Sequence, residues 1–219
     1  RFKGQVMKQL SQFQWIAKEG ATETVREVMQ PSVRFTRDEC LDLPPLMYET
    51  RQVPLTKDQG KAYKEMLTKL RIQAEEGDIT AVNEAVKMGK LVQIACGVVY
   101  APDGTEVTIP ATPRIEETRS ICHSAQGKVI VFVPYVSSVN MVAEELSKDF
   151  TVEIIHGGVK KDERDRIFAA FQKAKDPKVL VAQPAAMSHG LTLTAASTIV
   201  WYSCITSNET FEQANGRIN

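Results

Sequence analysis

The chain has 219 residues, of which 43% are hydrophobic and 25% charged, and its 27 basic residues balance 27 acidic ones. This composition is typical of a soluble globular protein with one core, or with one core and a small appendage. It argues against a nucleic-acid clamp that works by bulk positive charge, and the absence of any run of about 18 apolar residues excludes a membrane span.

The four cysteines are widely spaced and form no CxxC pair; they are Cys40, Cys96, Cys122 and Cys204. This pattern predicts free thiols and no metal site. The first residues, RFKGQVMKQL, contain no apolar signal core, so we expect a cytoplasmic protein. The chain starts without Met and stops just after Arg217, as if cut from a longer protein.

The first 42 residues resemble the tail of a larger unit. Helical character runs over residues 13–28, and residues 33–35 are a short extended candidate. The paired prolines of Leu43-Pro44-Pro45 stop any helix. Alternating polar and apolar residues predict a strand over residues 48–55.

A helical pair is predicted over residues 56–97, with a break at Gly77-Asp78. Thr56 and Gln59 have the spacing of a capping box, in which each side chain bonds the other residue's backbone N–H. Residues 98–110 follow as a β-hairpin, with Asp103-Gly104 at its turn.

From Thr112 onward helices and strands alternate. Strands are predicted at residues 128–133, 152–155, 179–182 and 198–202. Helices are predicted to start at Thr112, to include residues 139–146, to span residues 160–173 and to run from about 208 to the end. Ser137 or Ser138 is expected to cap its helix. Strands separated by helices of this length require a parallel sheet. The fold class is therefore α/β: a three-layer parallel sheet with flanking helices, plus the helical pair and the hairpin.

In such a sheet the functional loops follow the carboxyl ends of the strands. The unusual loops of this sequence all fall there: residues 134–137, 156–158, 183–190 and 203–207.

Five blocks in order resemble the second motor lobe of superfamily 2 helicases, especially the Swi/Snf branch in its bacterial and phage forms. The blocks are Arg34–Glu39 with Leu43–Pro45 and Val53–Thr56, Lys128–Val133, His156–Gly158 with Asp162–Arg164 and Phe171, Ser188-His189-Gly190, and Gln213-x-x-Gly216-Arg217. The resemblance covers nearly the whole chain and implies a RecA-like fold.

The resemblance implies residue roles at the nucleotide. Arg217 would be an arginine finger on the γ-phosphate of ATP, a group that can accelerate phosphoryl transfer by about 10³–10⁵. Gly190 would let the backbone approach the nucleotide, Gln213 would sense the nucleotide or the partner lobe, and Gly216 would leave room for close packing. Thr192 stands where the family usually has Asn.

The resemblance also implies a grip on the phosphate backbone of DNA, through amides and hydroxyls that read no sequence. The candidates are Ser137, Ser138, Gly157, Gly158, Lys160, Gln183 and Ser188.

No GxxxxGK loop is present. ATP and magnesium are therefore expected to be held mainly by a first helicase lobe outside this sequence. Residues 1–42 are interpreted as the tail of that lobe with the crossing segment, and residues 43–219 as the second lobe, interrupted within its last motif. The fragment alone is expected not to hydrolyse ATP.

Three alternatives stay open. The chain could be a DNA-binding or scaffolding module that keeps the fold without catalysis, or the lobe of an RNA helicase. An unrelated nucleotide-binding α/β domain is disfavoured, because no GxGxxG follows any strand.

Overall fold

The computed structural model describes residues 2–33, 46–75, 81–101, 103–187 and 193–218. The chain divides into two compact units, Arg1–Tyr48 and Glu49–Asn219. The assignment of the first unit to the tail of another lobe stays a prediction. No described helix is both long and apolar enough to cross a membrane.

The first unit is a short hairpin with two helices. Its elements are α1 (Phe2–Val6), β1 (Met7–Gln9), β2 (Trp15–Ala17) and α2 (Ala21–Val28). The helix predicted over residues 13–28 is therefore wrong in its first half: β2 pairs antiparallel with β1, and Gly20, with φ of 72°, precedes α2. The extended candidate at residues 33–35 lies largely outside the described residues.

The second unit begins with an irregular segment. Residues 46–56 form no strand, so the strand predicted over 48–55 is wrong. The helical pair follows as α4 (Lys57–Glu75) and α5 (Ala81–Cys96), and the hairpin as β3 (Val98–Tyr100) and β4 (Glu106–Thr108). Both predictions are confirmed.

The capping box is present at the start of α4. The hydroxyl of Thr56 accepts the N–H of Gln59 at 3.2 Å, and the Gln59 side chain accepts the N–H of Thr56 at 3.1 Å. The Gln59 amide then donates to the carbonyls of Ile94 and Ala95 at the end of α5, at 2.9 and 3.2 Å. The buried Gln59 side chain thus caps the start of α4 and also bonds carbonyls in the last turn of α5.

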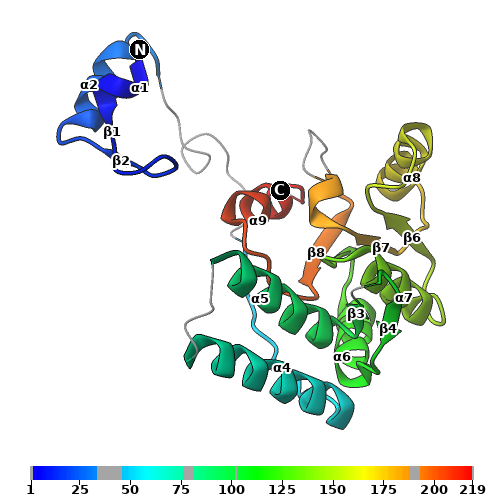
Figure 1. The fold of residues 1–219 in the computed structure, drawn as a ribbon. Coiled ribbons are helices and arrows are strands. Elements are labelled where there is room, and N and C mark those ends of the chain that lie inside the picture. Colours follow the sequence, from blue (N-terminus) through cyan, green and yellow to red (C-terminus); the bar gives the residue numbers. More distant parts are fainter. Residues whose placement is uncertain (1, 34–45, 76–80, 102, 188–192, 219) are drawn as a thin grey trace. The chain divides into compact units, whose positions relative to one another are not determined.

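The remaining elements alternate as predicted. They are α6 (Thr112–Ser124), β5 (Lys128–Phe132), α7 (Val136–Leu146), β6 (Val152–Ile155), α8 (Lys161–Lys173), β7 (Val179–Ala182), the 3₁₀ helix η1 (Pro184–Met187), β8 (Ala196–Trp201) and α9 (Asn208–Asn215). The four strands form one parallel sheet in the order β6-β7-β5-β8 (Figure 1).

Successive strand residues face opposite layers, as the pleat requires. Val129 and Val131 of β5 pack with residues of α5, α6 and α7, whereas Ile130 and Phe132 pack with residues of α8, η1 and α9. The sheet is therefore covered on both faces, and the predicted three-layer α/β fold is confirmed.

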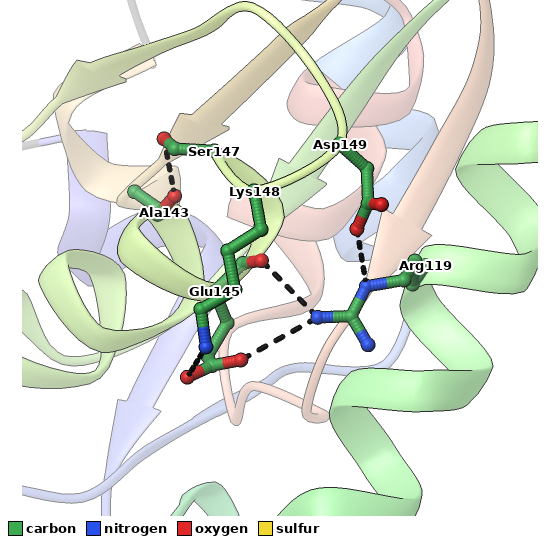
Figure 2. Close-up of polar contacts among 6 residues, drawn as sticks. All are labelled: Arg119, Ala143, Glu145, Ser147, Lys148 and Asp149. Carbon is green, nitrogen blue, oxygen red and sulfur yellow. Dashed lines mark hydrogen bonds and ion pairs between the residues drawn. The ribbon is translucent and has the colours of Figure 1, made fainter.

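A charged cluster ties α6 to the end of α7, as Figure 2 shows. The Arg119 guanidinium lies 2.7 Å from the carboxylate of Asp149 and donates to the backbone carbonyl of Glu145 at 3.1 Å. Lys148 pairs with the Glu145 carboxylate at 2.7 Å. The pKa of that carboxyl is lowered, chiefly because Lys148 donates a hydrogen bond to it. This cluster fixes the helix that follows the central strand.

Candidate functional site

The loops singled out in the sequence follow the carboxyl ends of the four parallel strands. Parallel strands place these ends at one edge of the sheet, which is where α/β folds bind ligands. This edge carries residues 133–135 after β5, 156–160 after β6, 183–187 after β7 and 202–207 after β8.

Gln183 anchors three of these strand ends. Its N–H donates to the carbonyl of Ile155 at 2.8 Å, and its side-chain amide donates to the carbonyl of Pro134 at 3.2 Å. Gln183 follows β7, which lies between β6 and β5, and it bonds the chain at the end of each of these two neighbours. The half-buried side chain still borders the edge where the DNA contact is predicted.

The loop after β6 is compact. The N–H of Gly158 donates to Nδ1 of His156 at 3.1 Å, and the N–H of Val159 donates to the carbonyl of His156 at 3.0 Å. Both glycines and Lys160 are exposed, and α8 starts directly after them. These three predicted phosphate contacts thus lie together on an accessible turn.

Ser137 and Ser138 occupy a different environment from the one predicted. Tyr135 precedes α7, which begins at Val136, so neither serine is the N-cap. Ser138 is 0% exposed and Ser137 is 6% exposed. The fully buried hydroxyl of Ser138 does not face the surface, so the structure gives no support to a contact between this side chain and a DNA phosphate.

The hairpin accounts for the burial of Ser137. The Ser137 hydroxyl donates to the Glu106 carboxylate and lies 2.8 Å from the Tyr100 hydroxyl, which also accepts the N–H of Ser137 at 3.3 Å. Both polar groups of Ser137 are therefore committed to β3 and β4. Both partners lie more than 30 residues earlier in the chain. A capping rule considers only residues within the same helix turn, so it does not predict these contacts.

The last helix ends sooner than predicted. α9 stops at Asn215, and Gly216 follows with φ of −67° and ψ of 0°. Arg217 therefore lies in a turn after the helix, and it does not share a helical face with Gln213. Gln213 is exposed and donates to the Glu209 carboxylate at 3.0 Å.

Main-chain bonds hold the backbone of Arg217. Its N–H donates to the carbonyl of Ala214 at 3.2 Å, and its carbonyl accepts the N–H of Leu193 at 2.7 Å. The half-buried arginine is thus joined to the first described residue after the Ser188-His189-Gly190 block. Ser188 and Gly190 themselves, with His189 and Thr192, lie outside the described residues.

Aromatic side chains that were not predicted from the sequence pack α9 against the end of β8. The Trp201 ring lies 4.8 Å from the Phe132 ring and 4.9 Å from the Phe211 ring, measured between centroids. Its indole N–H donates to the side-chain oxygen of Asn215 at 2.9 Å. The signal was the i, i+4 pair Phe211 and Asn215, which puts both on one face of α9 toward the end of β8.

Cys96 lies near the end of β8 but contributes no reactive thiolate. Burial raises the pKa of its thiol to about 11. The same cause raises the pKa of Cys122 to about 11. Both thiols are therefore neutral near pH 7 and act as small core residues.

Comparison with known proteins finds a family match in the part of the chain that holds the sheet. Residues 113–219 match the family model described as the helicase conserved C-terminal domain. The chain is 24% identical over 201 residues to the Bacillus subtilis (strain 168) protein YwqA, whose name describes it as an ATP-dependent helicase/translocase. That match covers 83% of this chain and 21% of YwqA, so the chain spans about a fifth of that relative.

Two solved structures from Sulfolobus solfataricus share the fold. The SWI2/SNF2 ATPase C-terminal domain has a TM-score of 0.57 at 22% identity and covers 69% of each chain. The SWI2/SNF2 ATPase core in complex with double-stranded DNA has a TM-score of 0.60 at 21% identity and covers 84% of this chain and 41% of its own.

Proposed function

We propose that the chain, whose residues 113–219 match the helicase C-terminal domain and whose fold is that of Swi2/Snf2 ATPase C-terminal domains, is the second lobe of an ATP-driven motor that moves on double-stranded DNA. The activity belongs to the full-length protein, in which a first lobe binds ATP and magnesium. The fragment alone does not hydrolyse ATP, because its sequence contains no GxxxxGK loop.

The observation that carries this proposal is that the glycine loop after β6 and the anchor residue Gln183 follow two neighbouring strands at the carboxyl edge of the sheet. The backbone of Arg217 is bonded to Leu193, in the segment that leads into the amino end of β8. A lobe that couples DNA to ATP needs its DNA-contacting loops and its nucleotide-facing arginine on connected elements.

Arg217 is the proposed arginine finger. Phosphoryl transfer is accelerated mainly by positioning and by neutralising charge on the transferred group, so a guanidinium delivered across the interlobe cleft lowers the barrier directly. Lobe closure would deliver it. Gln213, Gly216 and Gly190 are the accompanying residues on the nucleotide side.

The proposed DNA contacts are reduced to the accessible candidates. Gly157, Gly158 and Lys160 form the exposed turn after β6, with Gln183 beside it and Ser188 beyond the described residues. Ser137 and Ser138 are removed from this set because the hairpin and the core occupy them. The remaining contacts are to phosphates, so binding is independent of sequence and weakens with salt.

The proposal is tested by ATP hydrolysis of the full-length protein with duplex DNA, single-stranded DNA or duplex RNA added. We expect duplex DNA to give the largest stimulation. Stimulation by RNA alone would assign the lobe to an RNA helicase. ATP hydrolysis that no nucleic acid stimulates, or no hydrolysis at all, would favour the scaffolding alternative.

A further inference from the structure

His156 shapes the turn after β6 through two hydrogen bonds. Its ring nitrogen Nδ1 accepts the N–H of Gly158 at 3.1 Å, and its carbonyl accepts the N–H of Val159 at 3.0 Å. The side-chain bond reaches two residues ahead, in the way an Asx turn does. A single residue therefore closes the loop on which both exposed glycines lie.

The identity of Gly158 follows from the position of this ring. A Cβ added at Gly158 would lie 3.0 Å from Cε1 and 3.2 Å from Nδ1 of His156, which is tighter than an ordinary contact. A Cβ added at Gly157 would meet no atom within 4 Å. Neither glycine has a positive φ, so backbone conformation does not explain the requirement. Gly158 is small because the imidazole lies against it.

The hydrogen bond also fixes the form of the ring. A backbone N–H can donate to Nδ1 only when that nitrogen carries no proton, so the neutral imidazole has its proton on Nε2. The half-buried ring thus has its acceptor committed to the loop, and its N–H donor bonds none of the residues that the structure describes. The exposed Gly157 supplies a second N–H beside it.

We propose that His156 is the positioning residue of the DNA phosphate-binding turn: its Nδ1 holds the Gly157-Gly158 segment, and its Nε2–H joins the backbone as a donor to a phosphate oxygen. This inference rests on the proposed function. It adds a residue whose side chain sets the shape of the DNA contact.

The test is duplex-DNA-stimulated ATP hydrolysis by the full-length protein, measured as a function of DNA concentration. Hydrogen bonds to charged groups are worth about 10- to 100-fold in binding. We therefore expect His156→Ala and Gly158→Ala to raise the apparent KM for DNA by roughly tenfold or more, with kcat changed by less than about twofold. Gly157→Ala should raise KM less than Gly158→Ala, because its Cβ meets nothing.

The conservative variant separates positioning from general damage. Asn can accept the same N–H and offers its own amide donor, so His156→Asn should restore most of the DNA affinity. His123→Ala is the matched control, because His123 is an exposed histidine at the end of α6 whose ring contacts Phe150, a residue between α7 and β6. It should leave KM for DNA unchanged.

Two results would overturn the inference while leaving the proposed function intact: an unchanged KM in His156→Ala, or His156→Asn as defective as His156→Ala. Nitrogen NMR of the chain gives an independent reading, since a neutral His156 ring with its proton on Nδ1 would contradict the loop geometry. A full-length wild-type protein whose ATP hydrolysis ignores duplex DNA would overturn both the inference and the proposed function.

Discussion

The N–H of Leu193 donates to the carbonyl oxygen of Arg217 at 2.7 Å. This main-chain bond joins the segment entering β8 to the turn after α9. Leu193 is buried in the layer that contains Ala214 of α9. Main-chain bonds thus hold the backbone of the arginine that we propose as the finger.

In Arg217→Ala and Arg217→Lys the bond to Leu193 is retained, since it involves only main-chain atoms. The half-buried side chain has a further interaction, so we expect these substitutions to lower the free energy of unfolding of the 219-residue chain by about 1–2 kcal/mol, measured by urea denaturation. A loss of several kcal/mol would show that the guanidinium is a structural group. A loss of activity in these variants would then reflect unfolding and not the loss of an arginine finger.

Gln59 should be a stability determinant of the helical pair. Gln59→Ala removes the bonds to Thr56, Ile94 and Ala95 from a buried position, so the free energy of unfolding should fall by about 2–3 kcal/mol. Gln59→Glu keeps the acceptor for Thr56 but turns a carboxylate toward the two carbonyls, and should destabilise at least as much near pH 7.

Thr68→Ala is the control for this prediction. Thr68 is an exposed residue of the same helix whose hydroxyl donates to the carbonyl of Lys64 at 2.9 Å. Its loss should cost less than about 0.5 kcal/mol. Equal losses in the Gln59 and Thr68 variants would contradict the role given to the buried amide.

Contacts between residues close in sequence were predictable, whereas contacts between distant segments were not. The Thr56–Gln59 box was predictable because both partners lie within four residues. The alternation of helices and strands after Thr112 was predictable because each buried strand is a short apolar run between turn residues. The same local rule failed at Ser137, whose partners Tyr100 and Glu106 come from the hairpin.

Two further misses have physical causes. Alternation over residues 48–55 predicted a strand, but a strand needs a neighbour, and this segment has none in the described sheets. Helical spacing predicted that α9 reaches Arg217, whereas the chain turns at Gly216 to bond Leu193. Of the candidate site, the sequence located the exposed glycine loop but not the His156 bond that shapes it.

The three described cysteines should differ sharply in reactivity. Cys204 is exposed, whereas Cys96 and Cys122 are buried. In a Cys40→Ser background at pH 8, a thiol reagent should modify Cys204 rapidly and the other two only as fast as the chain unfolds. Rapid modification of all three without denaturant would contradict the packing of α5 and α6 against the sheet.

The raised thiol pKa values also predict a dependence of stability on pH. Unfolded cysteines ionise near pH 8.5, whereas folding raises the pKa of Cys96 and Cys122 to about 11. Between these values the unfolded state binds fewer protons, so the stabilising contribution is present below about pH 8.5 and is lost as the pH rises to 11. Urea denaturation of wild type and Cys122→Ala from pH 8 to 10.5 should show a shallower decline in the variant.

The Arg119 cluster should contribute more than an ordinary surface pair. Arg119 has a side chain 25% exposed and bonds both Asp149 and the Glu145 backbone, so Arg119→Ala should cost about 1 kcal/mol. Arg166 has a side chain 53% exposed and pairs with Glu153 and Glu163, so Arg166→Ala should cost less. Thermal unfolding of both variants checks the order, and the reverse order would contradict it.

The central claim is that this chain supplies the arginine that completes ATP hydrolysis in a DNA motor. The most direct measurement is the duplex-DNA-stimulated kcat of the full-length protein carrying Arg217→Ala or Arg217→Lys. We predict a fall of about 10³-fold or more in both, because a lysine cannot reproduce the guanidinium fork, with ATP and DNA binding largely kept. A kcat within about threefold of wild type in Arg217→Ala would contradict the account.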